Sequence, residues 1–194
     1  MGRTKSYERD DALDAAMYLF WARGYHAVTT RELTEAMGLN VYSLYAEFGS
    51  KQGLYEAAID RYAQQVVPGY IGALEQPGAN MATIREVLHR FPTFAGTGDD
   101  VRGCLICNAA TELAPTPDLS HGSMAAYLTR LTAAFEHALR QARADGTVRE
   151  SLEIAATARF LAGTLLGVFV MIRAQIDRGI VQDTVDGALA VLEA

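Results

Sequence analysis

Residues 29–51 decide the fold, and they read TTRELTEAMGLNVYSLYAEFGSK. Thr29 is followed three residues later by Glu32, which is the pattern of a capping box at the start of a helix. Gly38 suits the position just after a helix, and Asn40 suits the N-cap of the next one. Two short helices joined by a tight turn at a glycine predict a helix–turn–helix. The second helix of such a unit has the size to enter the major groove of DNA.

The sequence on both sides of this stretch is also helical in its apolar spacing. One helix precedes it and stops at Gly24, and Ser50 suits the N-cap of a fourth helix after it. Further along, the spacing predicts helices over residues 81–94, 104–113, 118–145, 151–177 and 182–192. We expect Ser151 to cap the fourth of these and Gly179 to end it.

No alternating apolar run with hairpin turns stands out, which disfavours strands. The sequence therefore predicts an all-α fold of about nine helices, in which a three-helix head containing the helix–turn–helix precedes a larger helical domain. The expected division is a DNA-binding domain over residues 1–50, a connecting helix over 51–67, and an effector-binding and dimerisation domain over 68–194.

The charge of the chain limits how it can bind DNA. Its 194 residues carry a formal net charge of −6, and the first 65 residues have no basic excess. Any DNA contact must therefore depend on a few well-placed side chains. No signal peptide is expected, and the apolar run Phe160–Ile172 is shorter than the roughly 20 residues that span a bilayer. We expect a cytoplasmic protein with no membrane partner and no cofactor.

Residues 8–55 resemble the DNA-binding domain of the TetR family of repressors. The family has a Leu-Tyr-x-x-Phe-x-Ser-Lys run at this place, and Leu44, Tyr45, Phe48, Ser50 and Lys51 meet it. The resemblance implies an all-helical homodimer that binds a palindromic double-stranded operator and is released by an effector.

The resemblance also implies DNA-binding roles for particular residues. Thr30 and Arg31 would touch phosphate or a base edge, and Asn40 would cap the recognition helix. Tyr42 and Ser43 would point into the groove, whereas Tyr45 and Lys51 would contact phosphate. Arg3 and Lys5 are expected in an arm near the DNA backbone or minor groove. Two positions depart from the family pattern: Tyr42 replaces a frequent glycine, and Glu47 either faces solvent or accepts from a cytosine.

Two segments near the C-terminus are candidates for subunit contact. Residues 160–169 are apolar on nearly every face, and Gly163 and Gly167 would let a partner helix approach closely. The last helix offers a second apolar face made of Val181, Val185, Leu189 and Leu192. The resemblance implies that these helices form a four-helix dimer interface; the alternative is that they only complete the core of one subunit.

Cys104 and Cys107 are the most individual feature of the C-terminal half. They lie about one helical turn apart, and we expect Cys104 in the first turn of a helix, where the helix dipole and the adjacent Arg102 lower a thiol pKa. The pair is either a reactive thiol sensor, half of a metal site with His89 or His121, part of a ligand cavity, or simply core packing.

An effector cavity is expected among the central helices, where aromatic and apolar residues mix with a few polar ones. The candidates for its wall are Leu88, Phe91, Phe94, Cys104, Cys107, Asn108, Thr111, Met124, Tyr127 and Thr164. The predicted function is a repressor released by a small molecule or a thiol-reactive effector. Two alternatives remain open: a thiol oxidoreductase that uses the two cysteines, and an activator or architectural DNA-binding protein without an effector.

Overall fold

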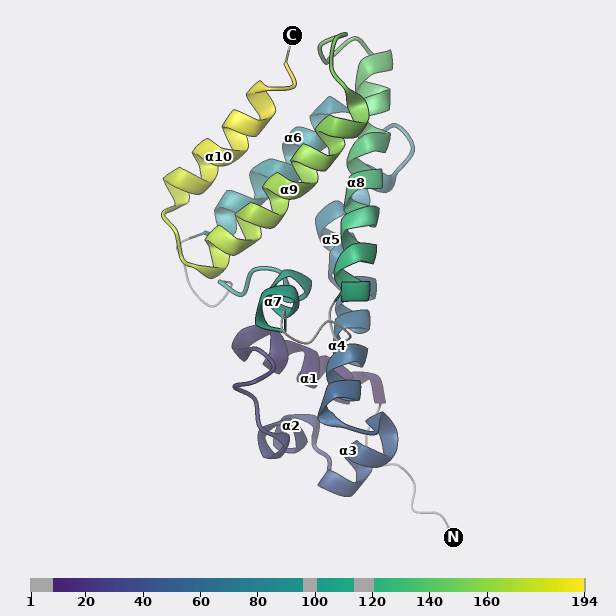
Figure 1. Ribbon diagram of the computed structural model, residues 1–194, viewed down its shortest axis with the longest axis vertical. Helices are drawn as coiled ribbons and strands as arrows, with labels where there is room; N and C mark the ends of the chain where they lie inside the picture. The colour runs from purple at the N-terminus through teal and green to yellow at the C-terminus, as the bar shows by residue number, and fades with distance from the viewer. Residues whose placement is uncertain (1–8, 96–100, 114–120, 194) are drawn as a thin grey trace.

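The computed structural model describes residues 9–95, 101–113 and 121–193, without the side chain of His121. Within these ranges the chain forms ten α-helices, two short 3-10 helices and no strand, so the predicted all-α fold is confirmed. The expected arm with Arg3 and Lys5 lies outside the described residues. Figure 1 shows an elongated molecule with α1, α2 and α3 at one end and α6, α8, α9 and α10 at the other.

The helices follow one another closely along the chain. In order they are α1 (Arg9–Arg23), α2 (Thr30–Met37), α3 (Val41–Phe48), α4 (Lys51–Gln65), α5 (Val67–Ile71), η1 (Gly72–Glu75), α6 (Met81–Arg90), η2 (Phe91–Phe94), α7 (Leu105–Glu112), α8 (His121–Ala144), α9 (Ile154–Arg173) and α10 (Arg178–Ala190). The count of about nine holds because one of the ten α-helices, α5, has only five residues.

The head, defined here as α1, α2 and α3, packs on the first part of α4. Leu33 of α2 and Leu44 of α3 are completely buried in this core. Phe20 of α1 meets Tyr55 of α4 edge to face, with ring centroids 4.8 Å apart. The helix α4 therefore shares the core of the head and continues into the rest of the molecule. The predicted division at residues 50 and 67 stays a prediction.

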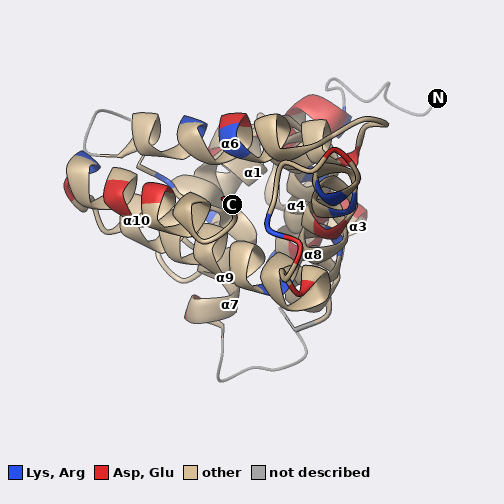
Figure 2. Cartoon of the chain, turned by 90° about the horizontal axis from the view of Figure 1, so that it is seen from above, with Lys and Arg blue, Asp and Glu red and all other residues tan. Residues whose placement is uncertain are grey.

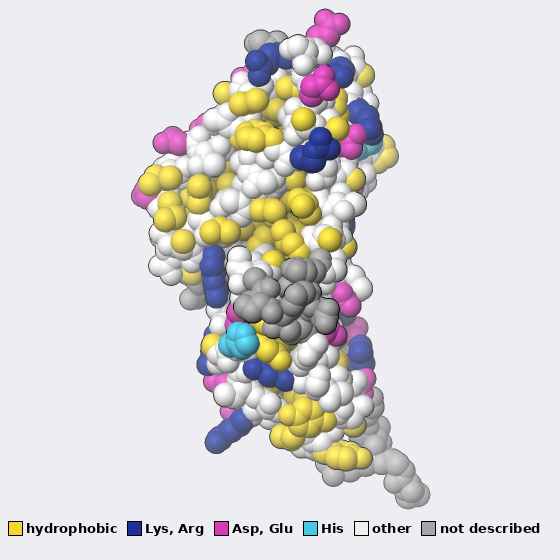
Figure 3. All heavy atoms as spheres, viewed as in Figure 1, with side chains coloured by type: hydrophobic (Ala, Val, Ile, Leu, Met, Phe, Trp, Pro, Cys, Tyr) yellow, Lys and Arg dark blue, Asp and Glu magenta, His cyan; other side chains and the backbone are white. Residues whose placement is uncertain are grey.

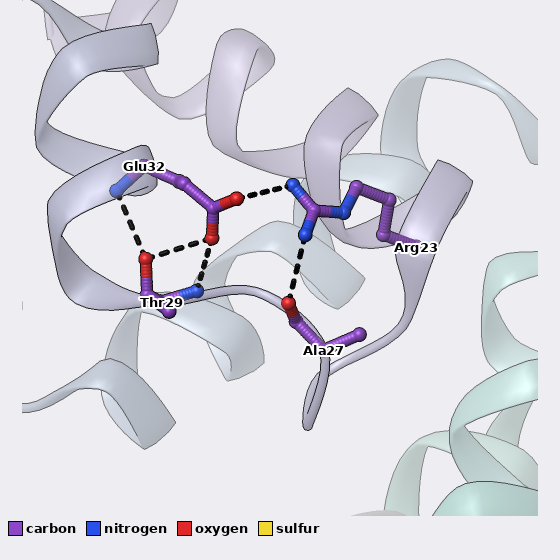
Figure 4. A network of polar contacts seen from close by, with 4 residues as sticks. All are labelled: Arg23, Ala27, Thr29 and Glu32. Carbon is purple, nitrogen blue, oxygen red and sulfur yellow. Dashed lines mark hydrogen bonds and ion pairs between the residues drawn. The ribbon is translucent and has the colours of Figure 1, made fainter.

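The start of α2 is the capping box that the sequence predicts, as Figure 4 shows. The Thr29 hydroxyl oxygen accepts from the N–H of Glu32 at 3.2 Å, and the Glu32 carboxylate accepts from the N–H of Thr29 at 2.8 Å. Arg23 also donates to Glu32 at 2.6 Å and to the carbonyl of Ala27 at 3.0 Å. Hydrogen bonds from the backbone and hydroxyl of Thr29, and then from Arg23, lower the pKa of Glu32 to about 2.

The next two helix starts are also capped as predicted. The Asn40 side-chain oxygen accepts from the N–H of Ser43 at 2.8 Å, and the Ser50 hydroxyl accepts from the N–H of Gly53 at 2.9 Å. Between α2 and α3, Gly38 has a φ of +64°, the left-handed conformation that glycine adopts without strain. These local signals fix the angle at which α3 leaves α2.

The beginning of α9 differs from the prediction. Ser151 was expected to cap it, but the helix begins at Ile154 and has no side-chain cap. The N–H of Leu152 bonds to the carbonyl of Arg149 in a turn, and the Leu152 side chain is buried. Leu152 thus belongs to a turn that precedes the helix.

The end of α9 also differs from the prediction. The helix was expected to run towards Asp177, but it ends at Arg173 because Gln175 takes a φ of +56°, which stops an α-helix. Asp177 instead caps α10 by accepting a hydrogen bond from the N–H of Gly179 at 2.8 Å. The predicted terminator Gly179 is thus part of the first turn of α10.

The helix α9 is the most apolar element of the molecule's C-terminal half. With 20 residues it is long and apolar enough to cross a membrane by length and composition alone, contrary to the shorter span expected from the sequence. Eight of its residues are buried in the structure, and the core helix of a soluble protein passes the same test. One side of α9 therefore packs in the core of the C-terminal half, and its remaining residues are exposed or partly exposed.

Removal of the Thr29 hydroxyl tests the capping box. Thr29→Ala is expected to lower the free energy of unfolding by about 1 kcal/mol, because it leaves a helix N–H without its acceptor. Urea denaturation measures this loss. The matched control is Thr129→Ala within α8, whose hydroxyl bonds only to the carbonyl of Ala125; it should change stability by less than about 0.5 kcal/mol. Equal losses in the two variants would contradict the capping role.

Candidate DNA interface and effector site

The outer face of α3 carries exposed aromatic side chains. Tyr42 is 84% exposed and Tyr45 is 43% exposed, three residues apart on the same side of the helix. Ser43 beside them is half-buried, and Leu44 is turned into the core. An aromatic side chain as exposed as Tyr42 contributes little to packing within this subunit. The face is therefore available to a partner, and the capping residue Asn40 fixes where the helix begins.

The remaining predicted DNA contacts lie at the starts of α2 and α4. Thr30 is the first residue of α2 and is half-buried, whereas Arg31 is exposed and pairs with Glu35 at 2.8 Å. The ammonium of Lys51 lies 4.4 Å from the ring centroid of Tyr25. Partial burial there lowers the pKa of Lys51. Exposed pairs such as Arg31–Glu35 contribute little stability, so this guanidinium can turn to a phosphate at small cost.

Acidic side chains accompany the basic ones throughout this region. Glu47, expected to face solvent or a base, accepts a hydrogen bond from Arg9 at 2.7 Å, and the Arg9 guanidinium also lies over the ring of Phe48 at 5.4 Å. Figure 2 shows basic and acidic residues interspersed around α3, α4 and α6. The head therefore depends on individual contacts to bind an anion, as its sequence charge implied.

The helix α7 carries both cysteines at its start. It begins at Leu105, so Cys104 is its N-cap residue. The prediction that Cys104 lies in the first turn of the helix is therefore wrong. Cys104 is completely buried and Cys107 is 7% exposed, and both are free thiols. Because the N-cap residue faces the free N–H groups of the first turn, the structure still places the Cys104 sulfur where a negative charge is favoured.

Hydrogen bonding makes the two thiols unequal. Burial by itself raises the pKa of Cys104, but hydrogen bonds from the Cys107 thiol and backbone N–H groups lower that pKa to about 7. The same interaction, together with burial, raises the pKa of Cys107. The hydrogen bond therefore favours a thiolate on Cys104 over one on Cys107.

Two buried tyrosines surround the Cys104 sulfur. Tyr62 of α4 is completely buried, Tyr127 of α8 is 4% exposed, and neither hydroxyl has a hydrogen-bond partner of standard geometry. After burial, the charge of Cys104 is the largest cause that raises the pKa of each hydroxyl. Three helices, α4, α7 and α8, thus meet at this thiol, and any group added to the sulfur must displace one of them.

The other end of α7 is bound to the head. The carboxylate of Glu112, the last residue of α7, accepts from the N–H of Tyr25 at 2.9 Å and from the N–H of His26 at 2.8 Å. Both N–H groups belong to the turn between α1 and α2, which begins at Gly24 with a φ of +85°. A side chain at Gly24 would meet the carboxylate, since its Cβ would lie 2.6 Å from Glu112 Oε2.

Sequence reasoning missed Glu112. The hydrogen bonds it makes join residues 86 and 87 positions apart, and no local pattern distinguishes it from a surface glutamate. Only the meeting of α7 with the α1–α2 turn reveals the contact. One eight-residue helix therefore links the cysteines to the head.

The predicted effector-cavity residues are spread over several environments. Phe91 and Phe94 line a cavity of about 140 Å³ beside α1, and Tyr127 lines another of about 150 Å³ between α4 and α8. Leu88 is completely buried, and Met124 is half-buried. A common cavity for the whole set remains a prediction.

The polar members of the predicted set bond to nearby backbone. The Asn108 amide donates to the carbonyl of Arg102 at 2.8 Å, and the Thr111 hydroxyl donates to the carbonyl of Asn108 at 2.9 Å. The Thr164 hydroxyl donates to the carbonyl of Phe160 at 2.9 Å. These side chains hold the loop before α7 and the helix backbones in place.

The geometry does not support a metal site that combines the cysteines with His89. His89 lies 2.9 Å from Asp186, and the side chain of His121 is outside the described residues. Among residues that the structure describes, no group of three His, Cys, Asp or Glu side chains gathers as metal ligands would.

Two segments of the chain match described families. Residues 12–58 match "Bacterial regulatory proteins, tetR family", and residues 81–187, more than half of the chain, match "Tetracyclin repressor-like, C-terminal domain". The chain belongs to the TetR family. The first match covers the helix–turn–helix and most of α4, and the second covers the helices from α6 to most of α10. The resemblance drawn from the sequence is confirmed.

TetR-family relatives and structures extend along nearly the whole chain. The HTH-type transcriptional repressor ComR of Escherichia coli (strain K12) is 32% identical over 178 residues, which cover 89% of this chain and 82% of ComR. The uncharacterized HTH-type transcriptional regulator YezE of Bacillus subtilis (strain 168) is 29% identical over 199 residues, which cover 100% of both chains.

A TetR-family structure solved with DNA is also similar. It is a variant of the regulator CifR with three cysteines replaced, in complex with a 26-base-pair double-stranded operator. Its TM-score is 0.84 at 30% identity, and the match covers 98% of this chain and 100% of that one.

Removal of the Glu112 carboxylate tests the link between α7 and the head. Glu112→Ala is expected to lower the free energy of unfolding by about 1–3 kcal/mol, because the partly buried N–H of Tyr25 and the exposed N–H of His26 lose a charged acceptor. Urea denaturation measures the loss. The control is Glu86→Ala on the exposed side of α6, for which a change below about 0.5 kcal/mol is expected. A loss no larger than that of the control would show that the contact does not hold the head.

Proposed function

We propose that the chain is a transcriptional repressor that binds a palindromic operator as a homodimer and releases it when an effector engages the C-terminal half. The observation that carries DNA binding is the outer face of α3, where Tyr42 is 84% exposed on a helix whose start is fixed by Asn40. The naming of ComR as a repressor and the operator complex of CifR support the same activity. Regulation of a bacterial chromosome places the protein in the cytoplasm.

The proposed contacts divide into base reading and phosphate binding. Tyr42 and Ser43 contact base edges, Tyr45 and Lys51 contact phosphates, and Thr30 and Arg31 contact either. Since each subunit has few cations for this purpose, two subunits are needed for useful affinity at physiological salt. A dimer would read half-sites about 34 Å apart or a multiple of that distance.

Substitutions on the α3 face test the proposal. Tyr42→Ala and Lys51→Ala are each expected to weaken operator binding by about tenfold or more, measured by fluorescence anisotropy with the DNA upstream of the protein's own gene. Lys51→Ala should also reduce the slope of log K against log salt by about 0.9 for each subunit.

The control for these variants is Leu128→Ala, which changes an exposed apolar residue on α8 and should leave affinity unchanged. If Tyr42→Ala and Lys51→Ala combined bind the operator as the unaltered protein does, α3 is not the reading helix.

The proposed dimer contact uses α9 and α10, although not all of the residues expected from the sequence. Val181, Val185, Leu189 and Leu192 are buried within their own subunit and cannot supply it. The apolar residues that remain exposed on or beside these helices are Phe160, Val170, Ile180 and Val191. Figure 3 shows apolar side chains gathered over this part of the surface. Gly163 and Gly167 have open space above them, where a partner helix fits.

The proposed effector chemistry is modification of the Cys104 thiolate. A pKa of about 7 gives this sulfur a substantial thiolate fraction at neutral pH. Its complete burial restricts the effector to a small oxidant or electrophile that enters as α7 opens. Oxidation would join the two thiols in a disulfide, with both electrons passing to the oxidant; an electrophile would form a thioether on Cys104.

The modified sulfur would act on the head by two routes. Added volume at Cys104 pushes against Tyr62 of α4, which shares its core with the head. A shift of α7 also withdraws the Glu112 carboxylate from the α1–α2 turn. Both routes favour a packing other than the DNA-competent one, and a coupling of about 1–3 kcal/mol corresponds to roughly 5–150-fold weaker operator binding.

A cysteine variant tests the thiol response. Hydrogen peroxide or N-ethylmaleimide is expected to weaken operator binding of the unaltered protein and to have no effect on Cys104→Ser. Mass spectrometry should show that the labelling rate of Cys104 rises with pH, is half-maximal near pH 7 and levels off at higher pH, since the rate follows the thiolate fraction. Cys107→Ser is the matched control and should still be alkylated at Cys104.

Unchanged operator binding after modification would discard the thiol response and leave DNA binding intact. We do not favour an oxidoreductase, because both sulfur atoms are too deeply buried to serve a large disulfide substrate.

A further inference from the structure

A second candidate site lies at the junction between the head and the C-terminal half. It is the cavity of about 140 Å³ mentioned above, and neither cysteine lines it. Its wall combines the backbone of Gly103, just before α7, with side chains from α1, α5, η2 and α9. These side chains are Trp21, Tyr70, Phe91, Phe94, Phe169 and Ile172.

Aromatic rings make up most of this wall, and they hold one another in position. Phe91 and Phe169 meet edge to face at 5.1 Å between centroids, and Tyr70 lies 5.6 Å from Phe169 and 5.8 Å from Phe91. Phe94 continues the row at 6.4 Å from Phe91. Rings at these separations offer both faces and edges to an additional ring.

The polar groups around Trp21 are already engaged. Its indole N–H donates to the carbonyl of Gly103 at 2.9 Å, and the Arg102 guanidinium lies 4.5 Å from the ring centroid. Arg173 donates to the carbonyls of Trp21 and Ala22 at 3.3 and 3.2 Å. No charged side chain is among the residues that line the cavity. A charged ligand would therefore lose its hydration without gaining a partner.

We propose that this junction cavity binds a neutral molecule with one aromatic ring. The volume supports this size, because an apolar protein cavity of about 150 Å³ is known to hold benzene. The site goes beyond the thiol response, since it requires no covalent step and no cysteine. Its occupant would contact α1 on one side and η2 and α9 on the other. Its binding would therefore be linked to the position of the head.

The single tryptophan of the chain provides a direct reporter. Trp21 is the only tryptophan and lines the cavity, so a bound ring should change its fluorescence. Toluene is the probe, titrated into the unaltered protein under reducing conditions, and benzoate is its charged counterpart. We expect a saturable change with toluene and none with benzoate at equal concentration. No saturable change with toluene, or an equal response to both, would overturn the proposal.

A variant locates the response in this cavity. Phe94 is half-buried at the cavity wall, and Phe94→Ala should weaken toluene binding by about fivefold or more through lost apolar contact. Leu128→Ala on α8 is the control and should bind as the unaltered protein does. Equal toluene affinity in folded Phe94→Ala and the unaltered protein would also overturn the proposal. The comparison of toluene with benzoate decides the question without any variant, even where Phe94→Ala unfolds.

Discussion

The arrangement of the molecule depends on one carboxylate that binds two backbone N–H groups. Glu112 ends α7 and accepts from Tyr25 and His26 in the turn before α2. Hydrogen bonds to a charged acceptor are worth about 1.5–3 kcal/mol, more than the exposed ion pairs elsewhere on the surface. The turn they hold leads directly into the capping box of α2, so the carboxylate adds to the packing on α4 that holds the helix–turn–helix against the C-terminal half.

The two proposed effector sites lie close to each other, because Gly103 lines the junction cavity and is followed directly by Cys104. Tyr62 of α4 meets the cavity residue Trp21 edge to face at 5.0 Å, and its hydroxyl is buried beside Cys104. A thiol adduct would thus press on Tyr62 directly, and a bound aromatic ring would reach it through Trp21. Because closely packed interiors transmit displacement, both events can reach the head through α4.

Because the chain is acidic, only a few of its basic side chains are available to contact DNA. The net charge is −6, and Arg9, Arg31 and Arg61 of the head and α4 are paired with Glu47, Glu35 and Asp14. The proposed recognition therefore relies on tyrosines and helix N-termini as well as on charge. Tyrosine hydroxyls and the backbone N–H groups at helix N-termini can donate hydrogen bonds to DNA without a net positive charge on the protein.

The sequence by itself determined the features that depend on strong signals between neighbours three or four residues apart. The all-α fold, the helix–turn–helix, and the caps at Thr29, Asn40 and Ser50 follow from such local signals. Only the tertiary structure decided where α9 begins and ends, that Val181 faces its own core, and that Cys104 precedes α7. It alone brought Glu112 to the α1–α2 turn and Trp21 to the aromatic wall of the cavity. These contacts join residues dozens of positions apart, and a helical pattern records which side of a helix is apolar but not which distant element covers it.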